Sequence, residues 1–109
     1  MQKGEVYYND IFAGILAKHG PEDYRFTYDD KYADNSAMPS ISVTLSKKQK
    51  EHASTRLFSF FSGLLAEGIN KNIQCRLLRI DENDDFTRLL KTANVDTIGA
   101  ITIKEIKEE

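Results

Sequence analysis

The sequence contains one cysteine, no tryptophan and only two prolines among its 109 residues. Cys75 alone cannot form an internal disulfide, and it has no second thiol with which to share a structural zinc ion. No apolar run approaches the roughly 20 residues that cross a bilayer. The opening MQKGEVYYND also lacks the basic-then-apolar pattern of a signal peptide. We therefore expect a cytoplasmic protein with no disulfide framework and no contact with a membrane.

Positive charge is also scarce. Fifteen Lys and Arg residues face 17 Asp and Glu residues, which gives a formal net charge of −2. Because a phosphate backbone is held by a basic field, nucleic acid is not expected as a direct partner. The one basic cluster, Lys47, Lys48 and Lys50, is more typical of a solvated loop than of a phosphate site. The chain length predicts a single domain over residues 1–109 with a frayed, charged tail at about 105–109.

Four strands are predicted in the first half of the chain. Runs rich in Val, Ile, Tyr and Phe predict strands at about 4–8 and 11–17, and alternation of apolar and polar residues predicts strands at about 23–29 and 40–46. Asn9 and Asp10 separate the first two strands and tolerate the positive φ angles of a tight hairpin. The stretch DDKYADNSAMP is rich in turn formers and ends in Pro39. It predicts a loop, with room for one helical turn.

After residue 54 the apolar residues follow a helical period. Ser54 or Thr55 can cap this helix, whose apolar positions are Leu57, Phe58, Phe60, Phe61, Leu64 and Leu65. These positions cover roughly 160° of the helix, whereas a one-sided surface helix needs little more than about 100°. The excess predicts either a second layer of the same domain or contact with another protein. Gly68 should end the helix.

Two further helices and a strand complete the expected layout. The helix after Gly68 would carry Cys75 on one face and Ile69, Ile73, Leu77 and Ile80 on the other. Asp84 or Asp85 would cap a short helix, and DTIGAITIKEI predicts a last strand in which Gly99 marks a bend or a close backbone approach. The fold class is α+β: a small antiparallel sheet or partly open barrel of about five strands, with two or three helices inserted before the last strand.

The acidic run fails the test for a calcium loop. Asp81, Asn83 and Asp85 occupy the first, third and fifth positions of such a loop. The sixth position requires glycine for a sharp turn but holds Phe86, and the twelfth requires a bidentate Glu but holds Thr92. Helix capping explains these acids better, so no metal site is expected.

No catalytic set is visible either. The sequence has neither a glycine-rich phosphate loop nor a serine nucleophile elbow. His19 and His52 lack ligand-spaced partners. Cys75 has no histidine near it in sequence, which leaves a small thiol enzyme as the least favoured alternative. We expect no enzyme activity, no cofactor and no catalytic residue.

Four segments in order resemble the N-terminal subdomain of HipA-type serine/threonine kinase toxins. They are the hairpin VYYNDIFAGIL, the strand, loop and strand YRFTYDDKYADNSAMPSISVTLS, the helix LFSFFSGLLAEG and the closing strand DTIGAITI. The resemblance covers residues from about 4 to 105. It is closest to stand-alone proteins that match this subdomain alone.

The resemblance implies a protein without the kinase core, acting in a split, three-part toxin–antitoxin system. Such a protein would bind and neutralise a separately encoded HipA-like kinase, while a helix-turn-helix protein binds DNA. The partner-binding residues implied by the resemblance are Phe58, Phe61, Leu65, Ala66, Glu67, Gly68, Ile69 and Asn70.

Two departures from the family pattern leave an alternative open. Ala66 stands where the family usually has proline, which makes the turn less rigid. Ile69 stands where split members often carry a bulky aromatic that would plug the kinase, and it buries less area. Ile69 is accounted for more simply as the first core residue of the following helix. The alternative function is therefore a structural subunit that completes and activates or stabilises the split kinase.

Overall fold

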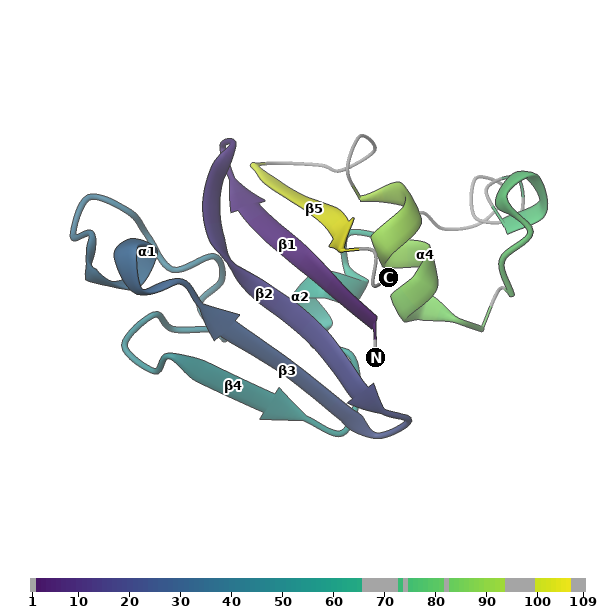
Figure 1. The fold of residues 1–109 in the computed structure, drawn as a ribbon, viewed down its shortest axis with the longest axis horizontal. Coiled ribbons are helices and arrows are strands. Elements are labelled where there is room, and N and C mark those ends of the chain that lie inside the picture. The colour runs from purple at the N-terminus through teal and green to yellow at the C-terminus, as the bar shows by residue number, and fades with distance from the viewer. Residues whose placement is uncertain (1, 66–72, 74, 82, 94–99, 107–109) are drawn as a thin grey trace.

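The computed structural model describes residues 2–65, 73, 75–81, 83–93 and 100–106. Its five strands form one antiparallel sheet in the order β4-β3-β2-β1-β5 (Figure 1). The strands are β1 (Gln2–Tyr8), β2 (Ile11–Gly20), β3 (Asp23–Tyr28), β4 (Glu51–Ser54) and β5 (Ile101–Ile106). The sheet is open, with β4 and β5 at its edges. The predicted α+β class is confirmed.

Three short helices are bounded within the described residues: α1 (Asp30–Asp34), α2 (Ser59–Ser62) and α4 (Asp85–Thr92). As predicted, helices are inserted before the last strand, because α2 and α4 both lie between β4 and β5 in the chain. Figure 1 shows α2 behind the sheet, α1 near one end and α4 near the other. No helix of the described part is long and apolar enough to span a membrane.

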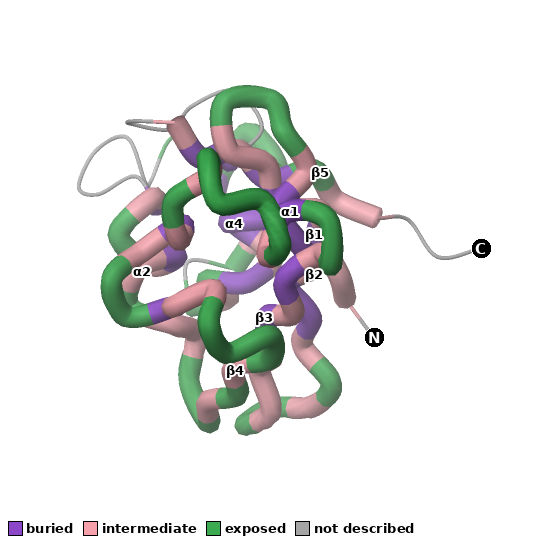
Figure 2. The backbone as a smooth tube through the Cα atoms, turned by 90° about the vertical axis from the view of Figure 1, so that its left-hand side faces the viewer, coloured by how far each residue is buried: buried purple, intermediate pink, exposed green. Residues whose placement is uncertain are grey.

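One hydrophobic core joins the sheet to the helices. It includes Val6, Leu16, Phe26, Tyr28 and Ile103 from the strands and Phe61, Phe86, Leu89 and Leu90 from the helices. Buried residues gather in the interior of the molecule in Figure 2. The alternation of β3 was predicted correctly, since Phe26 and Tyr28 are both buried.

The β1–β2 hairpin confirms the turn expected at Asn9-Asp10. Asn9 has φ 48° and Asp10 has φ 67°, and two positive φ angles in a two-residue loop match the twist of the flanking strands. The register shifts between Val6 and Tyr7, so that β2 contributes one extra residue, Ala13, which is buried. β1 remains paired with β2 along its whole length.

The predicted strand at 40–46 is wrong. This stretch holds only an isolated bridge between Ser42 and Leu45, and Val43 is 98% exposed at its tip. Ile41 and Leu45 are buried on either side of the turn, so a turn with buried flanks produced the alternation seen in the sequence. The fourth strand is instead the polar β4, which pairs with β3 at the edge of the sheet. Polar residues suit an edge strand because one side of it meets water.

Two tyrosines hold the loop between α1 and β4. The Tyr28 hydroxyl donates to the carbonyl of Leu45 and accepts from the amide of Ile41 at 3.1 Å. The Tyr32 hydroxyl donates to the carbonyl of Pro39 at 2.6 Å. The two rings stack with centroids 5.9 Å apart. Side-chain bonds therefore replace the ladder that a strand would have formed here.

The basic cluster is also part of this loop's structure. Lys47 donates from Nζ to the carbonyl of Asn35 at 2.6 Å and to that of Met38 at 2.5 Å. Lys50 forms an ion pair with Asp30 at 2.5 Å. The prediction of a solvated loop is thus incomplete, because Lys47 bonds to two backbone carbonyls at the start of the same loop.

The tyrosine pair predicts a loss of stability at alkaline pH. Burial raises the pKa of Tyr32 from about 10 to about 12 and also raises the pKa of Tyr28. Because the folded state holds these protons more tightly, the stabilisation is complete below pH 10 and is lost as pH rises towards 12. The denaturant midpoint, measured from pH 8 to pH 12, should therefore decrease between about pH 10 and pH 12. In Tyr32→Phe, the fall should be shallower; an equally steep fall would contradict the assignment.

The predictions for the C-terminal part of the chain are confirmed only in part. Asp84 caps α4 by accepting from the Thr87 amide at 3.1 Å and from its hydroxyl at 2.7 Å, as predicted. The tail prediction is wrong at Glu105 and Ile106, which belong to β5 and pair with β1. The bend expected at Gly99 lies outside the described residues.

Candidate functional site

The segment around α2 carries most of the predicted contact residues. The helix proper is one turn, Ser59–Ser62, and Phe58 occupies the N-cap position without a side-chain capping bond. The predicted cap at Ser54 or Thr55 is therefore wrong. Ser54 accepts the Arg56 amide through Oγ at 3.2 Å and shapes the approach to the helix instead.

The wide apolar face of this segment forms a second layer of the domain's own core. The Phe61 side chain is 0% exposed, and its ring centroid lies 5.7 Å from that of Phe26 in β3. Phe60 and Phe58 pack around it at 5.3 Å and 6.1 Å. Leu65 is also buried. In this chain alone, Phe61 and Leu65 offer little surface to a partner. Phe58 is only partly buried, as are Leu57, Phe60 and Leu64 on the same face.

The other predicted contact residues lie outside the described part of the chain. These are Ala66, Glu67, Gly68, Ile69 and Asn70. Their assignment to partner binding stays a prediction, as does the end of a helix at Gly68.

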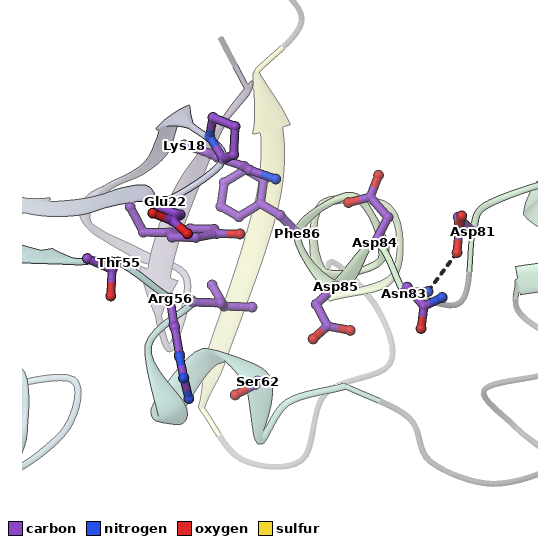
Figure 3. A pocket seen from close by; sticks show the side chains of 13 residues that line it. Lys18, Glu22, Thr55, Arg56, Ser62, Asp81, Asn83, Asp84, Asp85 and Phe86 are labelled. Atoms are coloured by element: carbon purple, nitrogen blue, oxygen red, sulfur yellow. Dashed lines mark hydrogen bonds between the residues drawn. The ribbon is translucent and has the colours of Figure 1, made fainter.

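A hollow of about 700 Å³ lies on one side of α2 (Figure 3). The β2–β3 turn, residues 55–57, Ser62 and the start of α4 surround it. Its apolar part includes Tyr24 and Phe86, whose ring centroids are 5.8 Å apart, and the Lys18 ammonium lies 5.4 Å from the Tyr24 ring. The hollow thus combines an aromatic surface with charges of both signs.

The three aspartates at this hollow are engaged in local structure. Asp84 caps α4, and Asp85 pairs with the buried Arg88 at 3.2 Å. Asp81 accepts the backbone amide of Asn83 at 2.8 Å. Among the described residues, no group of three His, Cys, Asp or Glu side chains is arranged to hold a metal ion. The hollow is therefore suited to binding through shape and charge.

A second hollow, of about 440 Å³, lies on the other side of the α2 approach. Phe58, Leu45 and His52 are among the residues that line it. Arg56 and Leu57 line both hollows. The approach to α2 is consequently a ridge between two concave surfaces, a shape that can engage a complementary protein.

The segment after residue 72 departs from the expected burial. Ile73 and Leu77 do lie on the opposite face from Cys75, but Cys75 is 4% exposed whereas Ile73 and Leu77 are 49% and 77% exposed. The apolar face thus points outward. Sequence reasoning missed this surface and the exposed Arg76 and Arg79 that flank it. The arginines alternating with the apolar residues were the available signal.

Comparisons with known proteins agree on one family. The model of the HipA N-terminal domain matches residues 4–104. A solved structure described as the N-terminal domain of HipA toxin is 25% identical, with a TM-score of 0.75. The similarity covers 100% of this chain and 96% of that chain. No curated protein matches the sequence.

Proposed function

This chain belongs to the HipA N-terminal domain family, and from that membership we propose that it is a non-catalytic antitoxin subunit. It binds a separately encoded HipA-like serine/threonine kinase and neutralises the kinase by protein contact. The family is linked to toxin–antitoxin systems. The observation that carries the proposal is the family match across residues 4–104, which extends over almost the whole described fold.

The chemistry of the described residues supports binding in preference to catalysis. Cys75 is buried, whereas reactive cysteines sit in partly exposed, electropositive surroundings. Beside the large hollow, Asp84 caps a helix, Asp85 forms an ion pair and Asp81 accepts a backbone amide. Arg56 and Leu57 line both hollows and form a ridge between them. A partner protein with a complementary shape could pack against this ridge and fill the hollows.

The complex is proposed to form in the cytoplasm and to include a helix-turn-helix, HipB-like protein as a further member. The net charge of −2 disfavours direct contact of this chain with nucleic acid. DNA binding would then belong to the helix-turn-helix protein.

Co-expression with the cognate kinase tests the proposal. We expect this chain to relieve the growth arrest caused by the kinase and to co-purify with it. A catalytically inactive kinase should co-purify equally well, because binding does not require the toxic activity. Absence of a complex, together with unrelieved growth arrest, would remove the proposal.

A second candidate function is supported by Ile69, which stands where an aromatic plug is expected. In this alternative the chain completes the kinase fold and raises its activity or solubility. The two functions differ in sign: an antitoxin lowers kinase autophosphorylation in a titration, and a missing subdomain raises it. A complex with increased toxicity would select the second function.

A further inference from the structure

An apolar surface extends beyond α4, separate from the α2 ridge. Residues 73 and 75–78 are helical, and in Figure 1 they lie past α4 at the far right. Cys75 is buried, whereas Ile73, Leu77 and Leu78 are all at least 48% exposed. Large apolar side chains gathered on one exposed helix mark a contact surface more often than isolated ones do. We call Ile73, Arg76, Leu77, Leu78 and Arg79 the projecting face.

The end of this helix is built around a strained arginine. The Ile80 amide donates to the Cys75 carbonyl at 2.9 Å, which is the 6→1 bond of a Schellman motif. Arg79 occupies the left-handed position of that motif, with φ 57°. Glycine is preferred there because a Cβ is disfavoured in this conformation. The presence of arginine instead of glycine at this position indicates that the arginine side chain has a function.

The charges on the projecting face have no partners within the chain as described. Arg76 and Arg79 are exposed, and neither makes an ion pair with another described residue. Asp81, two positions after Arg79 in the sequence, accepts the backbone amide of Asn83 instead. Within the described part of the chain, these two cations therefore remain available to an acidic group of a partner.

The charge pattern decides between classes of occupant. A nucleic acid or an anionic membrane would also meet Asp81, which follows Arg79 by two positions and is exposed, and the chain as a whole is negative. A second copy docked face to face would bring the arginines of both copies together, and like charges at an interface repel. A different protein with an apolar depression and an acidic border matches this face, because the depression can receive the apolar side chains and the acids can pair with the two arginines.

We propose that the projecting face docks on the kinase named above, with Ile73 and Leu77 seated in an apolar depression and the two arginines paired with acidic side chains of the kinase. This inference rests on the proposed function. The face follows in sequence directly after residues 66–70, which the resemblance assigns to partner binding. It would add to the contact residues a set that the resemblance does not assign.

Leu77→Asp tests the apolar part of this contact. Leu77 is 77% exposed, so an Asp there should leave the denaturant midpoint nearly unchanged. Affinity for the inactive kinase, measured by calorimetry, should fall at least about tenfold because a desolvated apolar contact becomes a charge facing acids. Val43→Asp is the matched control, since Val43 is 98% exposed in a separate loop, and its affinity should stay within about twofold of wild type.

Arg79→Gly tests the charged part and separates binding from folding. Glycine relieves the positive φ, so the unfolding midpoint should rise. Affinity should fall several-fold all the same, and its dependence on salt should become weaker because an interfacial cation is lost. A merely structural role for Arg79 cannot produce a more stable variant that binds less well.

The outcomes distinguish the docking face from the proposed function. Tight binding by wild type and by both Leu77→Asp and Arg79→Gly would overturn the docking face alone. Absence of binding by wild type would overturn the function and the docking together. A wild-type dimer that Leu77→Asp converts to monomer, with unchanged kinase affinity, would assign the face to a second copy and overturn the proposal.

Discussion

Replacement of Phe61 by Ala should destabilise the domain by about 3–5 kcal/mol. The Phe61 ring is 0% exposed and contacts three other phenylalanine rings between α2 and the sheet. Its removal leaves a cavity that the surrounding rings cannot fill without losing contacts of their own. Such a loss is a large share of the roughly 5–15 kcal/mol that stabilises a typical domain. Urea unfolding followed by far-ultraviolet circular dichroism measures it.

Phe58→Ala is the informative comparison for Phe61→Ala. Phe58 is only partly buried and lines the smaller hollow, so its removal should cost much less stability. We expect a folded protein with reduced affinity for the kinase. If Phe61→Ala instead kept its unfolding midpoint and lost only the partner, Phe61 would be an interface residue and its place in the core would be refuted.

Gly14→Ala should destabilise the protein by about 3 kcal/mol or more, at or beyond the upper end of typical overpacking costs. A Cβ on Gly14 would lie 3.0 Å from the Tyr28 Cα and closer still to the Thr27 carbonyl oxygen. Both are backbone atoms of β3, so no side-chain rotation can relieve the clash. The strand must move, and Tyr28 and the loop bonded to its hydroxyl move with it.

Gly20→Ala provides the matched control in the same strand. The nearest atom to a Cβ at Gly20 is the Asp23 Cβ at 3.9 Å, an ordinary van der Waals distance. Stability should therefore change by less than about 1 kcal/mol. Equal midpoints for Gly14→Ala and Gly20→Ala would show that β2 and β3 are not packed as closely as described.

Local chemistry was sufficient to predict those parts of the fold in which neighbouring residues decide the structure. Asn9 and Asp10 both adopt the positive φ that their side chains tolerate, and Asp84 caps α4. The stretch 40–46 shows the limit. Ile41 and Leu45 are buried through a turn whose backbone groups bond to Tyr28, a residue more than ten positions away. Periodicity within the segment cannot report that contact.

The candidate site was harder to predict because burial depends on distant partners. The width of the α2 face indicated an extra contact, but only Phe26 in β3 shows that the contact is internal. The helical period correctly separated Cys75 from Ile73 and Leu77. It could not tell which side faces the protein, because a period gives relative directions of side chains and not the position of the core.

The pairing of β1 with β5 has a consequence for biosynthesis. Residues 3–8 pair with residues 101–106, so the second neighbour of β1 is synthesised only after all the other strands of the sheet. The β1–β2–β3 meander can form earlier from its two hairpins, but until β5 arrives one edge of β1 offers unpaired amides and carbonyls to any nascent chain nearby. Protection of this edge from edge-to-edge aggregation therefore requires residues 101–106, and chains released before residue 101 would keep the edge open.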